Sequence, residues 1–197
     1  MADEDLEALE ADLPGLTKVG AFVRELDAIP WFANLGEPLS PGAEAAAKVF
    51  SDALGFPHAD VAVVANWEDA AAAAESLDWN TPAWEAEELL RTDIAARALD
   101  ELSEDALKFS MAAAADAVSS AADAAIEEAS SIWDLVDPEV RQLAVGAAAQ
   151  AAHGALLSRI AGAAEDDPAA QAFNAKFQLF EFGRWPIGVA GQTFNLF

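Results

Sequence analysis

The most constraining feature of this sequence is a long segment, residues 138–164, that is apolar around almost its whole circumference when wound as a helix. Asp137 and Pro138 are typical of a helix start, since a carboxylate often occupies the N-cap and proline the first helical position. A helix with so few polar positions requires neighbouring helices or lipid on nearly every side. Gln150 and Arg159 interrupt the apolar run, and alanine inserts poorly into membranes, so the sequence favours the interior of a helical bundle over a membrane.

One narrow stripe of this expected helix is polar. At 100° per residue, a single face carries Glu139, Gln142, Gly146, Gln150 and His153. Such a stripe inside a bundle predicts a polar slot, in which a histidine that titrates near neutral pH can act as a base or a ligand. We therefore predict Glu139, Gln142, Gln150 and His153 as ligand-binding residues. The alternative interpretation is that the stripe is the only wetted edge of the helix, or a satisfied polar seam.

Three glycines occur in the same segment, at Gly146, Gly154 and Gly162. Each glycine inside a helix costs about 1 kcal/mol relative to alanine. We therefore expect close packing to require a small residue at all three positions.

A second long helix is expected over residues 104–133, with Ser103 as its N-cap. Because the connection to Pro138 is short, the two long helices should be antiparallel neighbours. A short amphipathic helix is expected within residues 1–14, ending at Pro14-Gly15, and a second helix from Thr17 to about residue 28.

Further helices are expected over residues 41–54, 67–77, 81–102 and 168–182. The loop between residues 29 and 42 is unusually apolar, and we expect its aromatic residues either to fold back on the core or to form a partner patch. The sequence thus predicts an all-α, single-domain bundle of about eight helices over residues 1–197, built around the central antiparallel hairpin.

Two segments are ambiguous. Residues 58–65 fit a helix or a strand, and we favour a helix because the neighbouring segments are helical and no partner strand lies nearby in the sequence. Residues 183–197 are aromatic and glycine-rich, and they fit either a short β-hairpin that turns at residues 190–192 or an extended segment packed on the bundle.

The C-terminal segment also holds the predicted partner-binding residues, Arg184, Trp185, Phe194 and Phe197. Interfaces are enriched in aromatic residues and arginine and depleted in acids, which fits this segment and not the rest of the chain. The alternative is that the aromatic residues close the core.

Composition limits the possible partners and compartments. The formal charge of −25, from 35 acidic and 10 basic residues, disfavours binding to nucleic acid phosphates. The absence of cysteine excludes disulfides and thiolate metal sites and suits a reducing compartment. Because residues 1–5 lack the basic and apolar regions of a signal peptide, we expect a cytoplasmic protein.

No strong catalytic or metal-binding motif is present. The sequence contains no Glu-x-x-His, His-Glu-x-x-His, P-loop, Gly-x-Ser-x-Gly or EF-hand pattern. We therefore predict no catalytic residues, no metal and no cofactor.

Three functional hypotheses remain open. The leading one is a non-catalytic module that binds a protein partner or forms a homo-oligomer. The first alternative is a small-molecule-binding or enzymatic bundle with its site in the polar slot around His153. The second is an acidic inhibitor or immunity-type protein for a basic partner. Its binding surface would be the densest acidic region, formed by Glu85, Glu87, Glu88, Asp93, Asp100, Glu101, Glu104 and Asp105.

Overall fold

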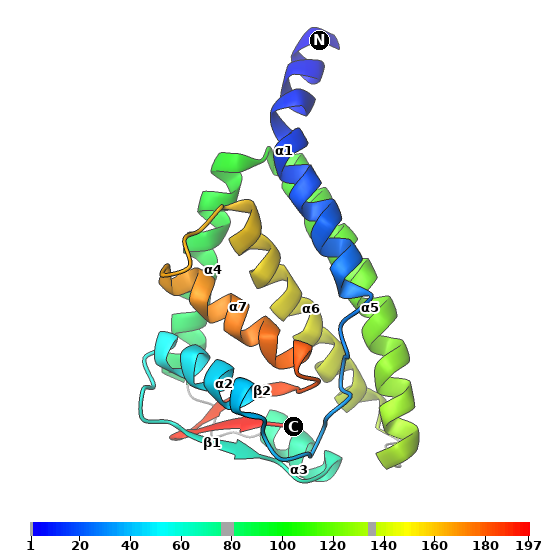
Figure 1. Ribbon diagram of the computed structural model, residues 1–197, viewed down its shortest axis with the longest axis vertical. Coiled ribbons are helices and arrows are strands. Elements are labelled where there is room, and N and C mark those ends of the chain that lie inside the picture. The colour runs from blue at the N-terminus through cyan, green and yellow to red at the C-terminus, as the bar shows by residue number, and fades with distance from the viewer. Residues whose placement is uncertain (1, 76–80, 134–136) are drawn as a thin grey trace.

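The computed structural model describes residues 2–75, 81–133 and 137–197. In chain order the elements are α1 (Ala2–Leu26), α2 (Pro41–Ala53), β1 (Asp60–Val63), α3 (Trp67–Ala74), α4 (Thr81–Glu101), α5 (Glu104–Trp133), α6 (Pro138–Ile160), α7 (Pro168–Glu181), β2 (Pro186–Ala190) and β3 (Thr193–Leu196). The fold is mainly helical, with one small sheet at the lower end in Figure 1. The expected helical class is confirmed, with seven helices in the described residues where about eight were expected.

The central hairpin is confirmed. α5 and α6 run antiparallel, and α1, α4 and α7 complete the cover of α6 (Figure 1). Asp137 caps α6 as expected, since its Oδ1 accepts a hydrogen bond from the Glu139 amide at 2.8 Å. α6 ends at Ile160 and not at residue 164, because Gly162 adopts a φ of +58° that a helix cannot continue through. No helix in the described residues is long and apolar enough to cross a membrane.

The expected break at Pro14-Gly15 is wrong, because α1 is one continuous helix with Pro14 inside it. Proline has a helix-compatible φ and removes a single backbone hydrogen bond, which surrounding contacts can offset. The Asp12 carboxylate accepts hydrogen bonds from the Ser103 amide at 2.9 Å and the Ser103 hydroxyl at 2.6 Å. One residue further on, a Cβ at Gly15 would lie 2.6 Å from Leu102 Cδ2. These contacts hold α1 against the α4–α5 corner, while its first turns project beyond the rest of the molecule (Figure 1).

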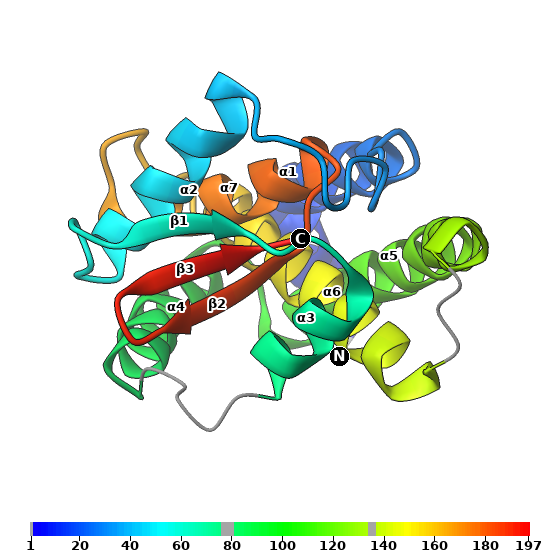
Figure 2. The same ribbon diagram turned by 90° about the horizontal axis from the view of Figure 1, so that it is seen from below.

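Residues 58–65 contain a strand, so the expectation of a helix there is wrong. β1 pairs in parallel with β3, from Asp60 opposite Thr193 to Val63 opposite Leu196. β3 in turn pairs antiparallel with β2, which confirms the C-terminal hairpin and gives the strand order β1-β3-β2 (Figure 2). The partner of β1 comes from the far end of the chain, which local sequence context does not reveal.

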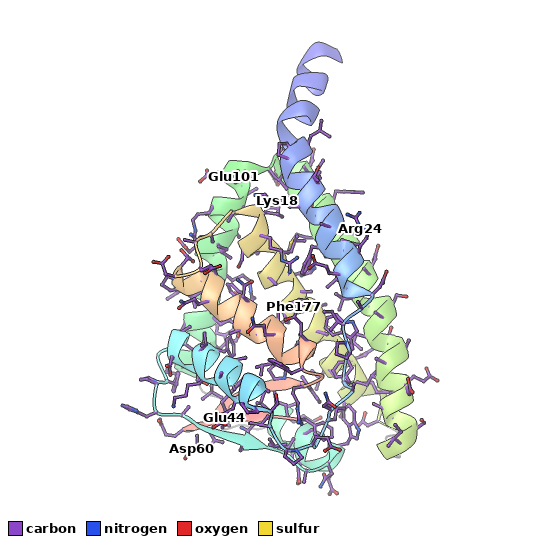
Figure 3. All side chains as sticks on the ribbon, viewed as in Figure 1. Lys18, Arg24, Glu44, Asp60, Glu101 and Phe177 are labelled. Carbon is purple, nitrogen blue, oxygen red and sulfur yellow. The ribbon has the colours of Figure 1, made fainter. Side chains whose placement is uncertain are left out.

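Aromatic side chains fill the centre of the molecule. Phe177 lies between α7 and α1, with its ring centroid 5.4 Å from that of Phe22, and occupies the middle of Figure 3. The apolar loop after α1 folds back on this core, since Trp31, Phe32 and Leu35 are all buried. A second buried cluster joins α2 and α7 to the inner face of the sheet. The sheet therefore packs against the bundle and contributes one wall of the cavity described next.

Candidate functional site

A cavity lies between α4, α6, α7 and β2, and we call it the α4–α6 pocket. Its volume is about 690 Å³, which is within the usual range for small-molecule sites. Figure 2 shows the elements around it, with β2 and α4 on one side and α6 on the other. The lining residues that matter most are Trp84, Glu87, Arg91, Gly146, Lys176 and Ile187.

The polar stripe of α6 forms one wall of this pocket. Glu139, Gln142, Gly146 and Gln150 all line the cavity. His153 is absent from the lining, because its Nε2 lies 3.0 Å from the backbone oxygen of Met111 on α5. The structure thus brings three of the four predicted ligand-binding residues to one cavity and places the fourth in a helix–helix contact.

The three glycines of this segment have three different surroundings. A Cβ at Gly154 would lie 2.5 Å from Phe173 Cδ1, so close packing does require glycine there. Gly162 lies beyond the helix end in a left-handed conformation. A Cβ at Gly146 would meet no atom within 4 Å. The expectation that packing requires a small residue at all three positions is therefore correct only for Gly154, and Gly146 faces open space in the pocket.

An ion-pair network forms the polar floor of the pocket. The Glu87 Oε1 atom lies 2.7 Å from Lys176 Nζ and 3.1 Å from Arg91 Nη2, and Arg91 also contacts Glu88 at 2.6 Å. The side chains of Glu87 and Lys176 are only 14% and 11% exposed. Burial raises the pKa of Glu87, but the charges and hydrogen bonds of Lys176 and Arg91 outweigh burial and hold the pKa below its ordinary value of 4.5. Glu87 is therefore a charged, fixed group, and not a candidate general base near neutral pH.

Apolar side chains line the remaining walls. Trp84 on α4 is 56% exposed and Leu143 on α6 is 45% exposed, and both line the pocket. Deeper in, Phe50 and Val189 are buried and contribute apolar wall. The pocket thus combines a polar floor, apolar walls and exposed apolar groups at its rim, as small-molecule sites commonly do.

The pairing of Glu87 with Lys176 was not among the predictions from the sequence. The available signal was the position of Lys176 within the aromatic run from Phe173 to Phe180, in a chain that has only four lysines. A lysine in a buried helix face requires a carboxylate partner, and that partner lies on α4, 89 positions away in the chain. The pairing follows from tertiary structure and not from local spacing.

The predicted partner-binding residues are buried. Trp185 and Phe197 pack on Trp67, with ring centroids 5.9 Å and 4.9 Å away, and Phe194 is fully buried. Arg184 donates a hydrogen bond from Nη2 to the Pro38 carbonyl at 2.7 Å, and burial lowers its pKa. These four residues are therefore buried in the core, and Trp185 and Phe194 also line the α4–α6 pocket.

The acidic region around α4 is partly neutralised within the chain. Four of its eight carboxylates form ion pairs, namely Glu87 and Glu88 as above, Asp93 with Arg97, and Glu104 with Lys108. In the described residues, no group of three histidine or carboxylate side chains gathers closely enough to hold a metal ion. Comparisons with protein-family models, curated proteins and solved structures found no match to this chain.

The half-buried His153 predicts a pH effect on stability. Burial lowers its pKa below the ordinary value of 6.5, the hydrogen bond to Met111 opposes this, and the charge of Arg91 lowers the pKa further. Because the folded state disfavours the charged form, the unfolded state takes up the proton first as the pH falls below 6.5. We expect the free energy of unfolding to decrease between pH 7.5 and pH 5.5, and this decrease to be smaller in His153→Gln.

Urea denaturation at the two pH values measures this difference. His58→Gln removes the exposed histidine and serves as the control. An equal decrease in the wild type and in His153→Gln would contradict a role for His153.

Proposed function

We propose that this protein binds a small organic molecule, without catalysis, in the α4–α6 pocket. The observation that carries the proposal is Gly146, a glycine in the middle of a well-packed helix that no neighbouring atom requires. Glycine at such a position costs about 1 kcal/mol relative to alanine. Gly146 lies on the pocket wall, where any side chain would occupy part of the cavity. A need to keep the cavity open therefore explains why glycine is present despite its cost.

The chemistry of the lining favours binding over catalysis. None of the described residues that line the pocket is a serine, threonine, cysteine, histidine or tyrosine. The buried ionisable groups, Glu87 and Lys176, are paired with each other at 2.7 Å. Fixed polar groups on an apolar wall are suited to orienting a ligand.

Filling the pocket tests this proposal. Gly146→Phe should place a ring in the open space beside Gly146 and abolish ligand binding, while the fold is retained because no atom lies in the way of its Cβ. The measurement is a small-molecule library screened by native mass spectrometry, with each bound mass confirmed by a thermal shift. We expect compounds that bind the wild type to lose at least about tenfold in affinity for Gly146→Phe, equivalent to about 1.4 kcal/mol.

The control for this test is Ala112→Phe, which adds the same ring at an exposed position on α5 outside the pocket. Compounds that bind the wild type and Ala112→Phe but not Gly146→Phe support the proposal. Binding that is equal in all three proteins, or a screen without any Gly146-dependent compound, would reject it.

A protein-interaction module is the second candidate and remains a prediction. Its specific support is now on α5, where Phe109 is 70% exposed and Ile132 is 76% exposed. At 100° per residue these two side chains lie about 140° apart around the helix, so they do not form one continuous patch. Isolated exposed apolar residues are common on monomeric proteins, and we therefore rank this function below ligand binding.

A further inference from the structure

We infer that the ligand of the α4–α6 pocket is an organic cation with a flat apolar body, such as an arylalkylammonium ion. This inference rests on the proposed function and adds the chemical class of the ligand. It is carried by the charges that remain unpaired in the pocket and by the exposed indole at its rim.

The pocket has an excess of negative charge. Its charged lining residues are four glutamates, one arginine and one lysine. Both cations are already engaged, Lys176 by Glu87 at 2.7 Å and Arg91 by Glu88 at 2.6 Å. The two remaining carboxylates, Glu75 and Glu139, form no ion pair with any described residue and are therefore open to an incoming cation from the described side of the pocket.

The positions of Glu75 and Glu139 suit a ligand that enters from outside. Both side chains are exposed, and they come from different elements, the C-terminal end of α3 and the first turn of α6. An exposed carboxylate can bind an ammonium group without the cost of burying an unpaired charge. An anionic ligand would instead meet these two carboxylates and find both pocket cations occupied.

Trp84 provides a surface for the apolar body. Trp84 is 56% exposed and lines the cavity, as does the partly exposed Leu143. Tryptophan stacks on flat rings and attracts cations through its π face more strongly than the other aromatic residues. A ring that carries an ammonium group therefore matches both parts of this rim.

The net charge of the chain reinforces this preference but does not create it. A formal charge of −25 raises the local concentration of any cation near the surface. That effect is unspecific, so the test must separate a local contribution of Glu139 from the general negative field.

The experiment uses three probes with the same indole body and different charge, namely tryptamine (positive), tryptophol (neutral) and indole-3-propionate (negative). Isothermal titration calorimetry on the full chain gives their dissociation constants. We expect tryptamine to bind more tightly than tryptophol, and tryptophol more tightly than indole-3-propionate, by about fivefold at each step.

Two variants with the same change in net charge separate the local effect from the general one. Glu139→Gln removes a pocket carboxylate. It should weaken the binding of tryptamine by about threefold to fivefold and leave the affinity for tryptophol unchanged. Asp123→Asn removes an exposed carboxylate of α5 outside the pocket and should leave all three affinities unchanged.

The inference is overturned if indole-3-propionate binds as tightly as tryptamine, or if Glu139→Gln and Asp123→Asn weaken tryptamine equally. Binding of none of the three probes also overturns it. The proposed function is decided separately, by whether any compound in the library screen depends on Gly146. A neutral or anionic compound that requires Gly146 would therefore preserve the binding function and reject the cationic class.

Discussion

Replacement of Glu87 by methionine is expected to lower the free energy of unfolding by about 2–3 kcal/mol. The substitution leaves the Lys176 ammonium, whose side chain is only 11% exposed, without the carboxylate that lies 2.7 Å from it. Removing one partner of a buried ion pair costs about 3–5 kcal/mol, and partial access to the pocket reduces this figure. Urea denaturation at pH 7 measures the loss.

The double variant Glu87→Met/Lys176→Met should recover most of this stability, because it removes both charges and keeps the apolar volume. Arg91 retains Glu88 as its partner in every variant. Glu104→Gln breaks the exposed pair with Lys108 and should produce no measurable change. If the double variant were as unstable as Glu87→Met, the loss of stability would come from the packing of the new methionine side chain and not from the unpaired charge of Lys176.

The same pair predicts an acid limit to stability. Because the pKa of Glu87 is below 4.5 in the folded state, its contribution is fully present above that pH and is lost as the pH falls through the lower folded value. Glu87→Met should therefore flatten this part of the pH profile of stability below pH 4.5.

Gly154→Ala is expected to lower the free energy of unfolding by about 2–3 kcal/mol. The added Cβ would lie 2.5 Å from Cδ1 and 3.0 Å from Cβ of Phe173, which is itself buried between α6 and α7. Overpacking of a tight core costs about 1–3 kcal/mol. Because the added atom would contact Phe173 close to its backbone, which cannot easily move, we expect the loss for Gly154→Ala to lie near the upper end of this range. Thermal and urea denaturation both measure the effect.

The matched control is Gly146→Ala on the same helix, which should have the opposite sign. With no atom within 4 Å of the new Cβ, only helix propensity acts, and the variant should gain about 0.5–1 kcal/mol. For a chain of this size the gain corresponds to a melting temperature about 2–4 °C higher per kcal/mol. If Gly154→Ala and Gly146→Ala changed the free energy of unfolding equally, the tight contact at Gly154 and the open space at Gly146 would be contradicted.

Much of the helical framework was predictable from local chemistry. Asp137 caps the helix that it was expected to begin, because a short polar side chain before an apolar run satisfies free amides directly. For the same reason, Ser40, Asn66 and Asp167 cap α2, α3 and α7. Helical spacing alone places the members of the polar stripe on one face of α6, and four of the five line the pocket.

The wrong predictions concern residues whose structure depends on contacts with segments far away in the chain. Residues 60–63 form a strand that pairs with β3, and the helix that continues through Pro14 is held by contacts such as those of Asp12 with Ser103. The ion pair in the pocket could not be predicted locally, because Lys176 lies on α7 and its partner Glu87 lies on α4. His153 was predicted to line the slot because it shares the stripe, but α5 approaches the helix at that end and supplies the Met111 carbonyl instead.

The parallel pairing of β1 with β3 has a consequence for biosynthesis. β3 is the central strand of the sheet, yet its residues 193–196 are synthesised more than a hundred residues after β1. A nascent chain can therefore assemble its helices on the ribosome while residues 60–63 still lack a partner. The β2 wall of the pocket is completed only when β3 emerges, so a truncated translation product would carry most of the helices and an unfinished pocket.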